Sequence, residues 1–237
     1  MAPHLTTAWQ APGMSDGQSF LDRLPPAAAE RFLALGRQRT LRAGAALVLE
    51  GDAAGRVWLV EDGLVKVASS HAHGREPIVA LRGQGELIGE LGAFDGAPRS
   101  ATVTAIVPTT AREFSGDDLR SELRRDPDAA FALMARLADR LREATARHVS
   151  QVGDGVAGRL AQTLLDLARA HGHPAPDGVG LQLDLPLTQE DLAGLVAASR
   201  DAVAKTLQTW RAQGLVTTGR RSINVIDPDT LAQRYIV

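Results

Sequence analysis

Cysteine is absent from the 237-residue sequence, which excludes disulfide scaffolds, thiol nucleophiles, and cysteine-ligated iron–sulfur or zinc sites. A chain without disulfides also fits a reducing compartment. No apolar run approaches the roughly 18 residues that a membrane span needs, and the first residues lack the basic and then apolar order of a signal peptide. These absences predict a soluble, cytoplasmic protein with no membrane partner.

Aromatic residues are also scarce, at 4%, whereas 44% of residues are hydrophobic and 23% are charged. These proportions are ordinary for a globular protein and exclude collagen-like and largely disordered chains. The net charge of −2 argues mildly against nucleic-acid binding, but binding to phosphates needs only a local positive field. Within residues 196–226 the one acidic residue is Asp201, and the basic residues are Arg200, Lys205, Arg211, Arg220 and Arg221.

Composition and periodicity divide the chain into four segments. The first is polar and aperiodic and predicts a disordered tail. The second opens with a short helix after a proline pair and continues as short apolar runs between glycine turns, a pattern typical of a β-sandwich or barrel. The third predicts one long helix and a glycine-rich hinge, and the fourth predicts helices, a strand and a terminal hairpin. The boundaries are 1–18, 19–126, 127–154 and 155–237, with the hinge at 151–156.

The long helix carries an apolar stripe at helical spacing, formed by Phe131, Met134, Leu137, Ala138 and Leu141. A helix of this length has more apolar surface than one domain needs to cover. The stripe can pack on the preceding strands, on a second copy of the chain, or on both.

Residues 85–105 combine a glycine-flanked carboxylate with an arginine–serine pair. Arg99 can give a phosphate two hydrogen bonds and Ser100 a third, while Glu90 can accept a bond from a ribose hydroxyl. The pattern suits a sugar phosphate. A surface turn with an arginine–glutamate ion pair is the alternative that the spacing alone leaves open.

The same stretch resembles the phosphate-binding cassette of cyclic-nucleotide-binding domains. The matching positions are Gly89, Glu90, Leu91, Arg99, Ser100 and Ala101. The resemblance implies that Glu90 meets the ribose 2′-hydroxyl and that Arg99 and Ser100 hold the cyclic phosphate. Ile88 stands where the cassette often has phenylalanine. By analogy with the family, Ala144 and Thr145 occupy the positions that contact the base, and only Thr145 has a hydroxyl to offer.

A second motif lies in residues 188–226. Thr188 is a good N-cap, with Asp191 three residues later where a capping box prefers Glu or Gln. A short turn ending at Ser199, which can cap the next helix, follows. Two short apolar-faced helices with such a turn predict a helix-turn-helix, whose second helix enters the major groove of DNA. A helical pair with a solvated charged face is the alternative.

This region resembles the winged helix-turn-helix of the CRP/FNR family of bacterial transcription regulators. Asp201 replaces the family's glutamate and Lys205 stands where arginine is common. The expected DNA-binding residues are Thr188, Gln189, Ser199, Arg200, Asp201, Lys205, Arg220 and Arg221. The order of segments along the chain agrees with the family as well.

The sequence therefore predicts an α+β protein: an N-terminal cyclic-nucleotide-binding β-roll, a long dimerisation helix and a C-terminal winged helix-turn-helix. The resemblance implies a homodimeric transcription regulator that binds a palindromic operator and RNA polymerase. Its allosteric ligand is expected to be cAMP, with cGMP as the second candidate.

Two other interpretations stay open: a regulator that senses another ligand or none, and a cyclic-nucleotide-binding adaptor without DNA binding. We expect no catalytic residues, no cofactor and no metal. The pair His71 and His73 is the nearest approach to a metal or haem ligand set, and a solvated hairpin turn explains it better.

Overall fold

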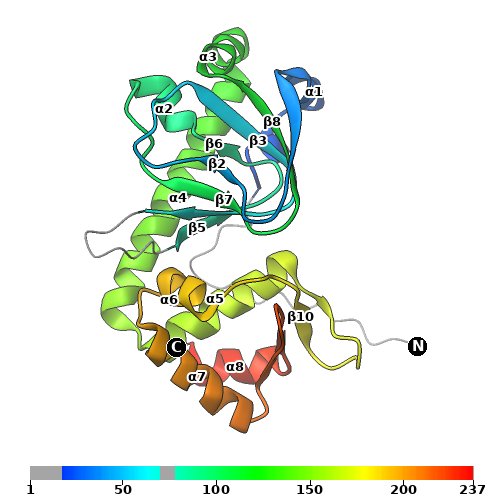
Figure 1. Cartoon of the computed structure of the whole chain (residues 1–237), viewed down its shortest axis with the longest axis vertical. Helices are drawn as coiled ribbons and strands as arrows, with labels where there is room; N and C mark the ends of the chain where they lie inside the picture. Colours follow the sequence, from blue (N-terminus) through cyan, green and yellow to red (C-terminus); the bar gives the residue numbers. More distant parts are fainter. Residues whose placement is uncertain (1–17, 70–77, 237) are drawn as a thin grey trace.

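The computed structural model describes residues 18–69 and 78–236. Most of the expected tail and the pair His71 and His73 lie outside these residues. The described chain forms a strand-rich upper body and a helical lower body, with one long helix, α4 (Pro127–Gly153), running down the side of the upper body to the lower one (Figure 1).

Eight strands build the upper body as two four-stranded antiparallel sheets, in agreement with the prediction from glycine-separated apolar runs. One sheet has the order β1-β8-β3-β6 and the other β2-β7-β4-β5. The strands are β1 (Arg37–Leu41), β2 (Ala46–Val48), β3 (Arg56–Asp62), β4 (Val65–Ala68), β5 (Ile78–Arg82), β6 (Leu87–Ile88), β7 (Thr102–Ala105) and β8 (Thr109–Ser115). Buried side chains of both sheets, including Val60, Val65 and Val103, form the core between them.

Helices cover one side of this roll. They are the 3₁₀ turn η1 (Leu21–Arg23), α1 (Pro26–Ala34), α2 (Glu90–Asp95) and α3 (Gly116–Arg125). Pro26 occupies the first turn of α1, where its missing N–H costs nothing. Phe32 of α1, Leu119 of α3 and Leu133 of α4 pack with β3 in a second core cluster.

The long helix differs from its predicted end. α4 continues to Gly153, so it takes in part of the stretch expected as a hinge, and the break falls at Asp154-Gly155. A glycine in the last turn of a helix costs only about 1 kcal/mol relative to alanine, which 27 residues of regular hydrogen bonding tolerate.

The lower body holds four helices and a four-stranded sheet of order β11-β12-β10-β9. Its elements are α5 (Val156–His171), β9 (His173–Pro174), β10 (Leu181–Leu183), α6 (Gln189–Leu195), α7 (Arg200–Ala212), β11 (Val216–Thr218), β12 (Ile223–Val225) and α8 (Pro228–Tyr235). The sequence prediction missed α8 and β9. The fully buried Trp210 of α7 and Leu231 of α8 pack in one core with α5.

The two bodies touch directly as well as through α4. In Figure 1, β5 lies above α6. Lys66 of β4 donates to Asp191 of α6 at 2.8 Å, and Leu81 of β5 packs against the apolar core of the lower body. Paired residues on neighbouring antiparallel strands share a face, and Lys66 pairs with Leu81. One outer face of the roll therefore supplies both contacts.

Candidate functional site

The glycine–glutamate turn of the cassette depends on a left-handed backbone. Gly89 has φ of +80° and precedes α2, and a Cβ built there would lie 2.4 Å from Nη1 of Arg99. Glycine is the residue that adopts this conformation without strain. The turn therefore brings the guanidinium of Arg99 against the first residues of α2.

Both charged cassette residues are buried: Glu90 is 3% exposed and Arg99 is 7% exposed. Arg99 donates from Nη1 to the carbonyl of Gly89 at 2.8 Å and from Nη2 to the carbonyl of Arg56. The alternative of a surface ion pair between Glu90 and Arg99 is not what forms, because Glu90 pairs with Arg140.

The other cassette residues differ in exposure. Leu91 and Ser100 are exposed, and Ala101 is half-buried just before β7 begins. The Ser100 hydroxyl is therefore open to a ligand that approaches from solvent.

A buried charge network, which the sequence analysis missed, ties the cassette to α4. Arg140 of α4 donates to Glu90 at 2.6 Å and also to Glu86 and to the carbonyl of Leu87. Arg136, one turn earlier, donates to Glu86 at 2.6 Å and to Glu143 at 3.0 Å. Any ligand that displaces Glu90 from Arg140 would act directly on α4.

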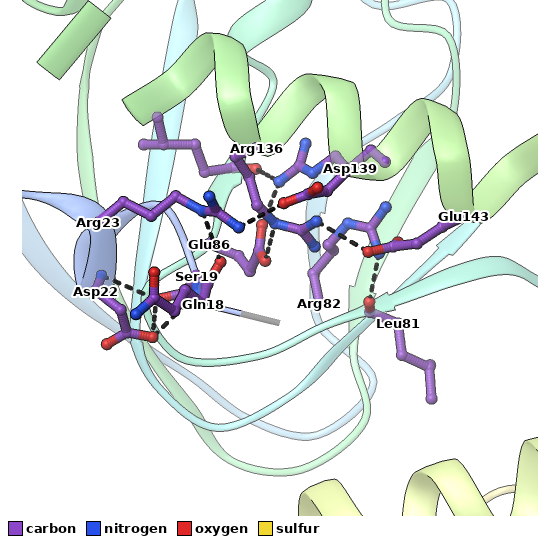
Figure 2. A network of polar contacts seen from close by, with 12 residues as sticks. Gln18, Ser19, Asp22, Arg23, Leu81, Arg82, Glu86, Arg136, Asp139 and Glu143 are labelled. Atoms are coloured by element: carbon purple, nitrogen blue, oxygen red, sulfur yellow. Dashed lines mark hydrogen bonds and ion pairs between the residues drawn. The ribbon is translucent and has the colours of Figure 1, made fainter. Parts of the chain in front are cut away.

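Figure 2 shows the far end of this network, where Arg82 rises from β5 toward Glu143 on α4. On the other side, Arg23 of η1 pairs with Asp139. A charged side chain recurs on one face of α4 at 136, 140 and 143, spaced i, i+4 and i+7. That spacing is the signal in the sequence that indicates a charged face on α4 beside the apolar stripe.

Thr145 is exposed, and its hydroxyl donates to the carbonyl of Leu141 at 2.9 Å. This bond back to the preceding turn is one that threonine commonly makes in helices, and it leaves the oxygen lone pairs available to a donor.

The helix-turn-helix has the predicted caps. Thr188 and Asp191 complete a capping box at α6, although Asp191 is shorter than the usual residue there. Ser199 accepts a bond from the N–H of Ala202 at 3.2 Å and caps α7. Ala197, in the turn between the helices, has φ of +47°, a left-handed conformation that is strained for alanine.

The first turns of α6 and α7 form an exposed polar surface. Arg200, Asp201 and Lys205 are exposed on α7, as are Thr188 and Gln189 on α6. A hollow of about 220 Å³ is lined by Glu190, Ser199, Arg200 and Asp201. Glu190 is a residue of this surface that the sequence analysis did not select.

The predicted wing is the β11–β12 hairpin, and both of its arginines are exposed. Arg221 has φ of +96°, in the region that non-glycine residues seldom adopt. The carbonyl of Ser222 accepts from the N–H of Gly219 at 2.8 Å and closes the turn.

No helix in the described parts of the chain is long and apolar enough to cross a membrane. Residues 18–69 and 78–236 contain no group of three or more His, Asp or Glu side chains that could hold a metal ion.

A buried glutamate–arginine cassette in a β-roll, joined by a long helix to a capped helix pair with a wing, defines a class: cyclic-nucleotide-binding regulators of transcription. Family models agree with this class. The cyclic nucleotide-binding domain matches residues 38–126, and the Crp-like helix-turn-helix domain matches residues 158–234.

Known proteins agree too. A CRP-like cAMP-activated global transcriptional regulator of Mycobacterium tuberculosis is 32% identical over 191 residues, 81% of this chain and 84% of that one. The cAMP-activated global transcriptional regulator CRP of Escherichia coli is 32% identical over 183 residues, 76% of this chain and 84% of that one. The solved structure of the c-di-GMP responsive regulator CLP of Xanthomonas campestris has a TM-score of 0.72 at 25% identity, covering 86% of this chain and all of that one.

The chain belongs to the CRP/FNR family of DNA-binding transcription regulators. This confirms the predicted family and the predicted α+β architecture.

Proposed function

We propose that this protein is a homodimeric transcription regulator whose DNA binding is controlled by a cyclic nucleotide, with cAMP as the first ligand to test. The observation that carries the proposal is the buried pair Glu90 and Arg99 on either side of α2. The names of the Mycobacterium and Escherichia relatives support cAMP. We assign ligand binding to residues 19–126, dimerisation to 127–154 and DNA binding to 155–237.

In this proposal Arg99 turns its guanidinium from the carbonyls of Gly89 and Arg56 to the cyclic phosphate, with Ser100 as a second donor. Glu90 exchanges part of its bond to Arg140 for the ribose hydroxyl. Gly89, Leu91 and Ala101 shape the turn around the sugar phosphate, and Thr145 meets the base.

A regulator of the same family with another ligand, or with none, is the second candidate. Ala144 has no hydroxyl for the base, and the donors of Arg99 already have carbonyl partners. The Xanthomonas neighbour, described as c-di-GMP responsive, shows that the fold serves a different ligand elsewhere.

The exposed face of α4 supports the homodimer. Phe131 is 65% exposed, Met134 is 54% exposed and Leu141 is 69% exposed, although all three are apolar. Their spacing follows a heptad seam, in which Ala138 and Thr145 fill the alternate positions. A second copy of α4 packed on this seam buries the three side chains and brings Thr145 to the partner's ligand.

Two-fold symmetry sets the DNA target. Each α7 would lie in a major groove, with Arg200, Asp201 and Lys205 at base edges. Thr188, Gln189, Ser199 and the wing arginines Arg220 and Arg221 would contact phosphates. The half-sites of a palindromic operator would lie about one helical turn apart. Acting on operators requires a cytoplasmic location, and we expect RNA polymerase to be the partner at promoters.

Ligand binding would shift a population of conformations that already exists. Loosening the bond between Glu90 and Arg140 changes how α4 packs on the roll, and the helix carries the change to the break at Asp154-Gly155. Ligand and DNA must then raise each other's affinity by the same factor.

Calorimetric titration with cAMP and with cGMP tests the cassette. We expect binding by the wild type, loss of binding in Arg99→Ala and weaker binding in Ser100→Ala. If neither nucleotide gives heat of binding, the second candidate holds: a regulator of the same family that senses another ligand or none.

A mobility-shift assay on operator DNA tests the proposed DNA binding and its dependence on the ligand. We expect a shift that the ligand strengthens and that Arg200→Ala weakens. If the chain bound the nucleotide and no DNA at low salt, it would instead be a cyclic-nucleotide adaptor.

A further inference from the structure

Arg82 lies on the inner face of the roll. It pairs across β4–β5 with Val65, and paired residues point to the same side of a sheet. Val65 is fully buried in the core between the sheets, whereas the next pair, Lys66 and Leu81, faces the lower body. The side chain of Arg82 is only 12% exposed, and in Figure 2 it points toward α4.

Among the described residues, this buried guanidinium makes two polar contacts. Its Nη1 donates to the carbonyl of Leu81 at 2.8 Å, and the carboxylate that faces it, on Glu143, is 4.0 Å away. Glu143 itself is engaged by Arg136 at 3.0 Å. By contrast, Arg136 and Arg140 each make a 2.6 Å contact with a glutamate.

Charges around Arg82 reinforce the contrast. Burial, together with the positive charge of Arg140, lowers the pKa of Arg82 to about 10, against the partial compensation of Glu86 and Glu143. Arg136, equally enclosed in the network, keeps a raised pKa because its carboxylate partners outweigh burial. A buried cation normally has a close charged acceptor, and the carboxylate paired with Arg82 among the described residues lies 4.0 Å away.

The position of Arg82 indicates which group of a bound ligand could accept its hydrogen bonds. Glu90, the expected ribose contact, binds Arg140, and Arg82 faces α4 at Glu143, almost one helical turn further along. Ala144, an expected base position, follows directly, and Thr145 beside it meets the partner's ligand in the proposed dimer. A nucleotide with its phosphate at Arg99 and its ribose at Glu90 would carry its base toward this turn of α4.

We propose that Arg82 is a specificity-determining residue that donates hydrogen bonds to the edge of a purine base, to N7 of either purine and also to O6 of guanine. Adenine presents an N6 amino donor where guanine presents O6, and arginine binds the N7–O6 pair in a bidentate manner. Both purines offer Arg82 the N7 acceptor, and guanine offers O6 as a second acceptor. The inference rests on the proposed cyclic-nucleotide site.

The test is calorimetry on the full-length protein with cAMP, cGMP and 7-deaza-cGMP, which lacks N7. Arg82→Leu should weaken cGMP binding about tenfold to a hundredfold, the range that a bidentate arginine contact supports, and should weaken cAMP binding less. The affinity ratio of cGMP to cAMP therefore falls in the variant. The wild type should bind 7-deaza-cGMP more weakly than cGMP, and Arg82→Leu should bind the two equally. A titration with cyclic di-GMP establishes whether the guanine belongs to a mononucleotide or a dinucleotide.

Arg31→Leu is the matched control. It removes a partly buried arginine of the same domain that pairs with Glu122 and Asp126, and we expect no change in the ratio. An unchanged ratio in Arg82→Leu, or equal binding of cGMP and 7-deaza-cGMP by the wild type, would overturn the inference. The second comparison uses only the wild type and holds even if the variant folds poorly. Binding that Arg99→Ala abolishes and Arg82→Leu spares overturns this inference alone, whereas a wild type that binds none of these nucleotides overturns the proposed function with it.

Discussion

Lys66→Met removes one side of the ion pair between the roll and the first helix of the helix-turn-helix. At 2.8 Å, Coulomb's law gives about 1.5 kcal/mol at the dielectric constant of water and about 6 kcal/mol at an effective constant of 20. The lysine side chain is 33% exposed and loses rotamer freedom in the pair. The net contribution is therefore about 1 kcal/mol, the upper end for exposed pairs.

The loss acts on docking and leaves α6 itself intact. In the variant, Oδ2 of Asp191 keeps its capping bonds from the N–H and the hydroxyl of Thr188, each at 2.8 Å, whereas Oδ1 loses its bond from Lys66. A change of about 1 kcal/mol shifts the equilibrium between docked and undocked bodies about fivefold. Leu81 still packs on the lower body in the variant, so part of the docking free energy is kept.

Hydrogen–deuterium exchange measured by mass spectrometry reads this out in peptides of β4 and α6. We expect about fivefold faster exchange there in Lys66→Met. Added salt should speed exchange in the wild type and have little effect in the variant, because the pair is partly open to screening. Lys205→Met is the control, because it removes the other lysine of the chain from the exposed face of α7. Exchange in Lys66→Met that matches the wild type at every salt concentration would refute the reasoning and leave packing alone as the docking force.

Three further substitutions test local features. Gly89→Ala should unfold at lower urea than Gly96→Ala, because both have positive φ but only the first places a Cβ against Arg99, while the second meets open space. Equal midpoints would contradict this. Partial desolvation lowers the pKa of His171 below its usual 6.5, although the residue is exposed overall, so a small part of the stability should be lost as pH drops from about 6.5 toward the folded pKa, and His171→Gln should remove that part in urea titrations at several pH values. Ala197→Gly should stabilise the protein by about 0.5 kcal/mol, because relief of the left-handed strain exceeds the added chain entropy, and a lower melting temperature would count against it.

Local chemistry was readable from the sequence. The helix caps at Thr188 and Ser199 are confirmed, since a cap needs only a side chain and an N–H two or three residues away. The glycine-separated strands are confirmed as well, because alternating apolar runs and turn residues are also local patterns. The end of α4 was placed wrongly, because one glycine near a helix end is a weak stop signal.

Long-range pairing was beyond the sequence. The sequence predicts a ribose contact for Glu90, whereas in the structure Glu90 accepts from Arg140, 50 residues along the chain. Nothing local in the sequence indicates that a helix will cross the cassette there. The apolar stripe of α4 was recognised, but the structure decided that Phe131, Met134 and Leu141 face outward while Leu133 faces the core.

The sequence by itself determined the family, the order of the segments and the residue types of both candidate sites, because caps, turns and the cassette are short-range patterns. Tertiary structure alone decided which charges meet. Lys66 and Asp191 are 125 residues apart, and Arg82 of β5 comes within 4.0 Å of Glu143 of α4 only in the folded chain. Contacts of that kind depend on how whole elements cross, and the residues on either side of them carry no local sign of it.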